Sequence, residues 1–296
     1  MKQLNVWITI LTLSLIWGSS FIAIKIVLDV IPPLFAFGIR FLVSGCILIL
    51  ASYISSKKNI EIKNILFWKN SFVLGIFFIV GGQGLLAWGA QYLSSGMTSL
   101  LNSTIPLWVV LLLIFVFHTK TTLLTKVGLG FGFGGMMILV GPSIESDEIS
   151  ITGIISLLLS SLFWAMGSIF SDKLSAPQNI FLSAGMFMLI GGILLLIVSI
   201  ILGEISLLPS IYDIDSNFIL SYLFLIFVCT VIGYAEFYWL LKKTTAPVAN
   251  TFAYIVPVVA IFLGWVILDE YITFLTIVAT IIILIGVGLI VIKSHK

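Results

Sequence analysis

Ten long apolar runs constrain the fold of this chain more than any motif does. Each run holds about 20 residues, the length of helix that crosses a hydrocarbon layer of about 30 Å. Only 9% of the 296 residues are charged, whereas about a quarter of a soluble domain is charged. The runs are continuous rather than alternating, which excludes a transmembrane β-barrel. The sequence therefore predicts an all-α integral membrane protein with ten transmembrane helices, at residues 4–28, 33–54, 71–92, 96–117, 123–141, 151–171, 179–202, 217–241, 246–267 and 272–292.

The distribution of lysine and arginine predicts the orientation. With the N-terminus in the cytoplasm, twelve of the fourteen basic residues lie at cytoplasmic ends of the runs, as the positive-inside rule requires. The other two, Lys25 and Arg40, lie inside spans near the opposite face. We therefore expect a multi-pass protein of the cell membrane with both termini in the cytoplasm. We also expect segment 55–71, which mixes lysines with apolar residues, to form a helix lying on the inner membrane surface.

The two halves of the sequence resemble each other. At an offset of 151 residues, ungapped matches pair Gly82 with Gly233, Trp88 with Trp239 and Pro106 with Pro257. At an offset of 147, Trp17 matches Trp164. We expect two five-helix repeats, residues 1–141 and 151–296, joined by an acidic external linker at 142–150. Because five is odd, the second repeat would enter the membrane inverted, which is typical of secondary transporters.

The chain resembles the EamA family of the drug/metabolite transporter superfamily in its length, its two halves and the segments WGSSFIAIKIVLDVIPPLFAFGIRFLVSG (17–45) and TAPVANTFAYIVPVVAIFLGWVILDEYIT (245–273). The resemblance implies a ten-helix inner-membrane carrier, usually an exporter of amino acids or other small metabolites, with a central cavity between the halves. The family's recurrent acid after the fourth helix of each half is present as Glu270, whereas Thr119 stands in the first half. That departure weakens the case for a gate shared by paired acids.

Polar residues on the fourth and ninth runs predict part of a substrate-binding cavity. If each run is one continuous helix, the repeat aligns two polar stripes, one formed by Ser99, Ser103 and Pro106 and the other by Asn250, Tyr254 and Pro257. Asn102 borders the first stripe. A polar stripe on a membrane helix faces protein or water rather than lipid. Cavity lining and hydrogen bonding between helices both remain open for these residues.

Aromatic and amide side chains deep in other runs extend this candidate site. Trp17 and Trp164 lie too far inside their runs to be interfacial anchors, so they face a cavity or pack in the core. Ser20 flanks Trp17. Gln83 and Tyr234 are repeat mates that each follow a glycine, where helices pack closely. These two could contact a substrate or satisfy a neighbouring backbone group.

Three charges inside the runs need a role, because an ionised side chain at the bilayer centre costs about 2.5–3.5 kcal/mol. Glu236 lies a few residues before Lys242 and Lys243 at the cytoplasmic end of the eighth run. It is the candidate proton-coupling group, and the alternative is a carboxylate that reaches the interface or pairs with Lys243. For Lys25 and Arg40 the sequence favours a structural role, with an anion-attracting outer vestibule as the alternative.

The sequence predicts a secondary-active efflux permease for small organic metabolites, either amino acids or amphipathic, drug-like solutes, working by alternating access. A lipid flippase and a non-transporting sensor or assembly subunit are the alternatives. We expect no enzyme, no cofactor, no metal and no nucleic-acid partner, because the runs supply neither a nucleophile–base pair nor a ligand cluster. Expected partners are a small-molecule substrate and the bilayer, with proton coupling and oligomeric state left open. The motif of Gly130, Gly132 and Gly135 lies inside a span without a preceding strand, so we expect helix packing there instead of phosphate binding.

Overall fold

A computed structural model describes residues 2–55, 65–119, 122–145, 150–173, 180–209 and 214–291. Over these residues the chain is helical and contains no β-strand. Eight helices are long and apolar enough to cross a membrane, and two shorter apolar helical stretches, Leu123–Ile138 and Phe274–Gly286, lie where the fifth and tenth spans were expected. The prediction of an all-α membrane protein is therefore confirmed.

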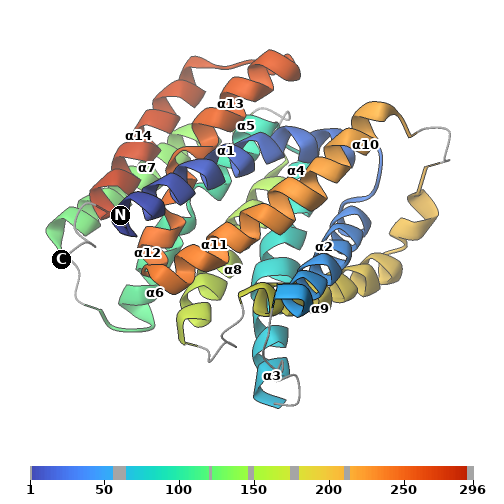
Figure 1. The fold of residues 1–296 in the computed structure, drawn as a ribbon. Coiled ribbons are helices and arrows are strands. Elements are labelled where there is room, and N and C mark those ends of the chain that lie inside the picture. Colours follow the sequence, from blue (N-terminus) through green and yellow to red (C-terminus); the bar gives the residue numbers. More distant parts are fainter. Residues whose placement is uncertain are drawn as a thin grey trace.

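The elements follow the apolar runs along the chain (Figure 1). Up to residue 145 they are α1 (Lys2–Leu28), α2 (Pro33–Ser55), α3 (Ile65–Leu74), η1 (Gly75–Gly84), α4 (Leu85–Ala90), α5 (Ser95–Asn102), α6 (Ile105–Phe115) and α7 (Leu123–Glu145). From residue 151 they are α8 (Ile151–Lys173), α9 (Ile180–Ile201), η2 (Glu204–Leu207), α10 (Ser216–Leu223), η4 (Phe224–Ile232), α11 (Gly233–Lys243), α12 (Ala246–Ala249), η5 (Asn250–Tyr254), α13 (Val256–Ile267) and α14 (Phe274–Val291). Two of these stretches, η1 and η4, are π-helical, a rare conformation that is frequent at functional sites.

The third apolar helix begins earlier than its composition suggests. Its first residue is Ile65, whereas the predicted span begins at residue 71. Phe67 in its first turn is buried and packs with Leu182 and Met186 of α9. Residues 65–71 therefore begin the apolar helical stretch Ile65–Ala90, whereas the sequence predicted that they belong to a separate helix on the membrane surface. Residues 56–64 of that predicted helix lie outside the described part of the chain.

The fourth and ninth runs are interrupted rather than continuous helices. Between α5 and α6 the chain leaves the α-helix at residues 103–104, and between α12 and α13 it passes through the 3₁₀ turns of η5. Pro106 and Pro257 each occupy the second position of the following helix, where a missing N–H costs no helical hydrogen bond. Neither run is therefore the single continuous helix from which the two polar stripes were predicted, because the helical period changes at each break.

Glycines bring two pairs of helices into backbone contact, and Figure 1 shows both pairs, α2 beside α9 and α7 beside α14. A Cβ atom added at Gly45 would lie 2.7 Å from the Leu189 nitrogen, and one at Gly192 would lie 2.6 Å from the Leu42 nitrogen. In the second pair, a Cβ atom at Gly286 would lie 2.6 Å from the Gly128 oxygen. No side chain larger than hydrogen fits at these crossings without moving a backbone.

Only part of the glycine-rich segment of α7 serves helix packing. A Cβ atom at Gly132 would meet Leu107 of α6, and one at Gly135 would meet Ile283 of α14. A Cβ atom at Gly130 or Gly134 would meet none of the described atoms within 4 Å. The packing prediction is therefore confirmed for Gly132 and Gly135 and is wrong for Gly130.

Candidate functional site

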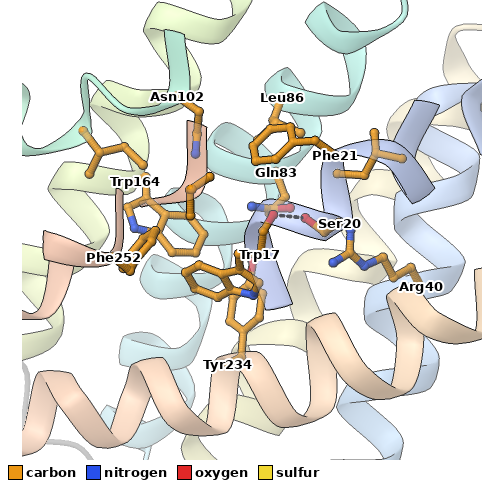
Figure 2. A pocket seen from close by; sticks show the side chains of 13 residues that line it. Trp17, Ser20, Phe21, Arg40, Gln83, Leu86, Asn102, Trp164, Tyr234 and Phe252 are labelled. Carbon is orange, nitrogen blue, oxygen red and sulfur yellow. Dashed lines mark hydrogen bonds between the residues drawn. The ribbon is translucent and has the colours of Figure 1, made fainter. Parts of the chain in front are cut away.

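A cavity lies among residues from ten elements of the chain, which are α1, α2, η1, α4, α5, α6, α8, α11, η5 and α13 (Figure 2). The polar side chains that line it are those of Ser20, Arg40, Gln83, Asn102 and Tyr234. The aromatic side chains that line it, besides Tyr234, are those of Trp17, Phe21, Trp164 and Phe252. The wall is therefore mostly apolar with a few polar groups, as is usual for sites that bind amphipathic molecules.

One end of the cavity is a layer of aromatic rings centred on two tryptophans. The rings of Trp17 and Trp164 meet edge to face with centroids 5.5 Å apart, and Phe252 lies 4.7 Å from Trp17. Tyr234 contacts both tryptophans, at 5.4 and 5.6 Å. Edge-to-face pairs contribute about 0.5–1.5 kcal/mol each beyond the area they bury. The layer is therefore held by several mutually supporting ring contacts.

Hydrogen bonds fix the orientation of both indoles. The Trp17 Nε1–H donates to the Cys229 carbonyl at 2.9 Å, in the π-helical η4. The Trp164 Nε1–H donates to Asn250 Oδ1 at 3.1 Å, in the 3₁₀ segment η5. A π-helix or a 3₁₀ turn changes the direction of backbone and side chain relative to a regular α-helix. The irregular segments thus supply the acceptors that hold the two rings.

Arg40 reaches the cavity from α2, on the opposite side from Trp164 (Figure 2). Its Nε donates to Thr230 Oγ1 at 2.7 Å, and its Cζ lies 5.0 and 5.1 Å from the ring centroids of Phe37 and Phe41. Its Nη1 is buried and has no hydrogen-bond partner among the described residues. The Tyr234 hydroxyl is buried and unpartnered in the same way. Two residues of this wall therefore carry buried polar groups that have no hydrogen-bond partner among the described residues.

The structure gathers most of the predicted site residues at this cavity. Trp17, Ser20, Gln83, Asn102, Trp164 and Tyr234 line it. Ser99 and Ser103 are buried elsewhere and donate to carbonyls of their own helix, at 2.7 and 2.6 Å. Asn250 stands behind Trp164 and also donates to the Ala246 carbonyl at 2.8 Å. The side chain of Tyr254 lies outside the described part of the structure.

Glu236 lies away from the cavity, between α11 and α1. It is half-buried and accepts hydrogen bonds from Thr12 Oγ1 at 3.1 and 3.2 Å. No ion pair joins it to Lys243 within the described residues. Lys25 does not line the cavity either, so Arg40 is the intramembrane charge that reaches it.

Glu270 joins the loop after α13 to the start of α5. Its carboxylate accepts from the Ser95 backbone at 2.7 Å, from Ser95 Oγ at 2.8 Å and from the Gly96 backbone at 3.2 Å. These are unsatisfied N–H groups of a helix N-terminus, where a negative charge is favourable. Its repeat mate Thr119 instead donates to the Leu113 carbonyl at 2.6 Å, so this tie occurs in only one of the two halves.

Several residues of the cavity wall carry no distinguishing sequence signal. Phe21, Leu86, Phe252 and Val256 line the cavity, yet apolar residues of these types occur throughout every run. Arg40 did carry a signal, since a cation within an apolar run needs a partner or a function. The sequence contains no acid at helical spacing from Arg40 within its own run, and this could have favoured the functional interpretation.

These apolar helices and the cavity enclosed among them define a multi-pass membrane protein of the transporter class. The EamA-like transporter family matches residues 5–141 and 151–292, and the chain belongs to this family. It is 27% identical to the uncharacterized transporter YoaV of Bacillus subtilis, over 96% of each chain. It is 29% identical to the uncharacterized inner membrane transporter YedA of Escherichia coli, over 85% of this chain and 79% of that protein.

Two further comparisons extend over nearly the whole chain. An uncharacterized transporter of Archaeoglobus fulgidus is 28% identical over 97% of this chain and 99% of its own. One solved crystal structure matches with a TM-score of 0.68 at 15% identity, covering 99% of both chains, which establishes the likeness of fold. The matched relatives are transporters rather than enzymes, as the sequence predicted.

Proposed function

We propose that the protein is a secondary-active efflux permease of the cell membrane that moves small organic metabolites by alternating access. The cavity carries this proposal, because both halves of the chain build its wall. Trp17 and Gln83 come from the first half, and Trp164 and Tyr234 come from the second. A site between two halves becomes accessible from one side of the membrane or the other as the halves move relative to each other.

We propose ten spanning helices arranged as two inverted repeats, residues 1–141 and 151–296, with residues 142–150 as the linker. Contacts between the halves support this arrangement. An offset of 147 relates Gly38 to Gly185 and Gly45 to Gly192. Gly45 packs against Gly185, and Gly192 packs against Gly38. When each glycine is replaced by its repeat mate, the contact between Gly45 and Gly185 becomes the contact between Gly192 and Gly38. Two units related by a two-fold axis are expected to show such a pair of equivalent contacts.

The position of the cavity along the helices suggests which side it faces. With the N-terminus in the cytoplasm, Phe21 and Ile24 follow Trp17 toward the outer end of α1, and both line the cavity. The cavity then lies on the outer side of the ring layer that contains Trp17, Trp164 and Phe252. We infer that this layer closes the inner path and that separation of its rings opens it.

Glu236 is the group that we propose for proton coupling. It lies on α11 two residues after Tyr234, which lines the cavity, and before the basic inner end of that helix. Its recorded hydrogen bonds both come from the Thr12 hydroxyl, so its protonation would disrupt no ion pair among the described residues. A carboxyl group placed there could exchange protons with the cytoplasm and respond to movement between α1 and α11.

Transport in reconstituted liposomes tests the proposal. The wild-type protein would be assayed for counterflow of labelled amino acids, amphipathic acids and amphipathic amines. Ser20→Phe, which fills the cavity, should abolish counterflow, and Gly134→Ala, at an open position of α7, should leave it unchanged. The proposal fails if no solute moves faster than through empty liposomes, or if the filled variant transports as the wild type does.

A further inference from the structure

We propose that the cavity selects amphipathic carboxylates, with Arg40 and Tyr234 as the groups that bind the carboxylate. This deepens the proposed function, since it names the chemical class of the transported molecule. Arg40 is the only charged residue among the described residues that line the cavity. A solute with one negative charge forms a neutral pair there, whereas a cation meets an uncompensated positive charge.

A purely structural role does not account for the burial of Arg40. Arg40 is 2% exposed, and removing a guanidinium from water is strongly unfavourable unless a partner compensates. Its described contacts are one hydroxyl, that of Thr230, and the faces of Phe37 and Phe41. No carboxylate pairs with it within the described residues. The described structure therefore has a desolvated cation at the cavity wall and no anion paired with it among the described residues.

Two residues that line the cavity, Arg40 and Tyr234, each carry a donor that has no hydrogen-bond partner among the described residues and could serve a carboxylate oxygen. Arg40 Nη1 and the Tyr234 hydroxyl have no hydrogen-bond partner among the described residues, and Tyr234 is also 2% exposed. Burying a donor without a partner is unfavourable, and more so when the donor is charged. A bound carboxylate would accept from both groups at once, and hydrogen bonds from a guanidinium to a carboxylate are among the strongest that proteins form.

The rest of the wall defines the remainder of the molecule. Trp164 and Phe252 lie on the side of the cavity away from Arg40, and Trp17 and Phe21 also line it (Figure 2). An apolar or aromatic body fits against them, and a dianionic headgroup such as a phosphate monoester would exceed the single positive charge available. The absence of an acid among the described lining residues also makes an ammonium group dispensable. We therefore infer a monocarboxylate with an apolar body as the preferred ligand.

Binding of four matched phenyl compounds to the purified protein tests this inference. They are 3-phenylpropionate, its uncharged amide, phenethylamine and phenylalanine, and binding is followed by tryptophan fluorescence and by thermal stabilisation. We expect the two carboxylates to bind, the amide to bind at least tenfold more weakly and the amine weakest of all. The inference is overturned if the amide or the amine binds as tightly as 3-phenylpropionate, or if neither carboxylate binds. This comparison uses the wild-type protein alone, so it does not depend on the folding of a variant.

Variants then assign the selectivity to its residues. Arg40→Gln should weaken 3-phenylpropionate binding at least tenfold while leaving the weaker binding of the amide unchanged, and Tyr234→Phe should weaken it about threefold. Lys25→Gln, which removes a cation that does not line the cavity, should have no effect. Equal binding of 3-phenylpropionate by Arg40→Gln and wild type would refute the assignment.

The same compounds in liposomes separate this inference from the proposed function. Carboxylates that bind with the expected selectivity but never cross the membrane would contradict the transporter and leave the binding site standing. Translocation of the amine without carboxylate binding would contradict the site and leave the transporter standing.

Discussion

The indoles of Trp17 and Trp164 touch each other at an interplanar angle of 86°, and each N–H is bound to an acceptor from an irregular segment of the second half. Trp17 is tied to η4 and Trp164 to η5. The two rings therefore connect the wall of the cavity to the segments whose backbone is least regular. A change of conformation in η4 or η5 would be transmitted directly to the ring layer.

Trp164→Phe should destabilise the protein by about 1–3 kcal/mol, because it leaves Asn250 Oδ1 buried without its donor. In an Asn250→Leu background the same substitution should cost less, since no acceptor is left unsatisfied. Thermal unfolding in detergent of the two single variants and the double variant measures the difference. Trp265→Phe, at an exposed tryptophan, is the control. Equal costs in both backgrounds would show that the hydrogen bond does not hold the ring.

Gly45→Ala should destabilise the protein by about 1–3 kcal/mol, the usual cost of overpacking a tight contact. The added methyl group would meet backbone atoms of Leu189 and Gly185 at 2.7 and 2.9 Å, and a backbone cannot rotate away. Gly134→Ala, where the described structure leaves open space, should stabilise by about 0.5–1 kcal/mol through helix propensity. The unfolding midpoint should fall for Gly45→Ala and rise for Gly134→Ala. Shifts of the same sign in the two variants would contradict the close backbone contact at Gly45.

Glu270→Gln should weaken the connection between the α13 loop and α5, because charged hydrogen bonds contribute about 1.5–3 kcal/mol. The loss should shrink when Ser95→Ala is already present, since both residues belong to one network. Asp269→Asn is the matched control, because asparagine tolerates the positive φ of 52° at this neighbouring position. If Asp269→Asn lowers the unfolding midpoint more than Glu270→Gln does, Glu270 is not the acid that connects the α13 loop to α5.

Glu236→Gln should remove the dependence of transport on a pH gradient while leaving ligand affinity unchanged, because Glu236 does not line the cavity. Glutamine keeps an oxygen that can accept from Thr12, so folding should be little affected. Thr12→Val tests the hydrogen bond separately and should retain pH-gradient dependence. If Glu236→Gln and the wild type respond alike to the gradient, Glu236 is a structural carboxylate.

Cysteines at Thr119 and Asp269 test the orientation, because both residues are exposed and the proposed topology puts them on opposite sides of the membrane. In a background without Cys46, a membrane-impermeant maleimide should label Asp269→Cys in intact cells. It should label Thr119→Cys only after the cells are permeabilised. The reverse pattern would invert the proposed topology, and labelling of both in intact cells would contradict the number of spans between them.

The sequence predicts those features of the fold that depend on apolar length and on unusual side chains. Continuous apolar runs located the helices. Trp17, Gln83 and Tyr234, which are unusual residues inside apolar runs, line the cavity, and their role in binding stays a prediction. Ser99 and Ser103 were expected at the cavity, but their hydroxyls donate to carbonyls of their own helix. The sequence cannot distinguish a serine that bonds within its helix from one that lines a cavity. The π-helical and 3₁₀ segments were not predicted, since packing against neighbouring helices decides them rather than local composition.

The glycine crossings have a mechanical consequence for any motion between the halves. Backbones that touch directly have no long side chains to disengage, so α2 can rotate against α9, and α7 against α14, while staying in contact. A small rotation of this kind displaces atoms by an amount that grows with their distance from the contact point. α1, α8 and α11 lie between these two pairs (Figure 1). The crossings can therefore act as two fixed pivots, and the largest displacements would fall at the ends of the helices that surround the cavity.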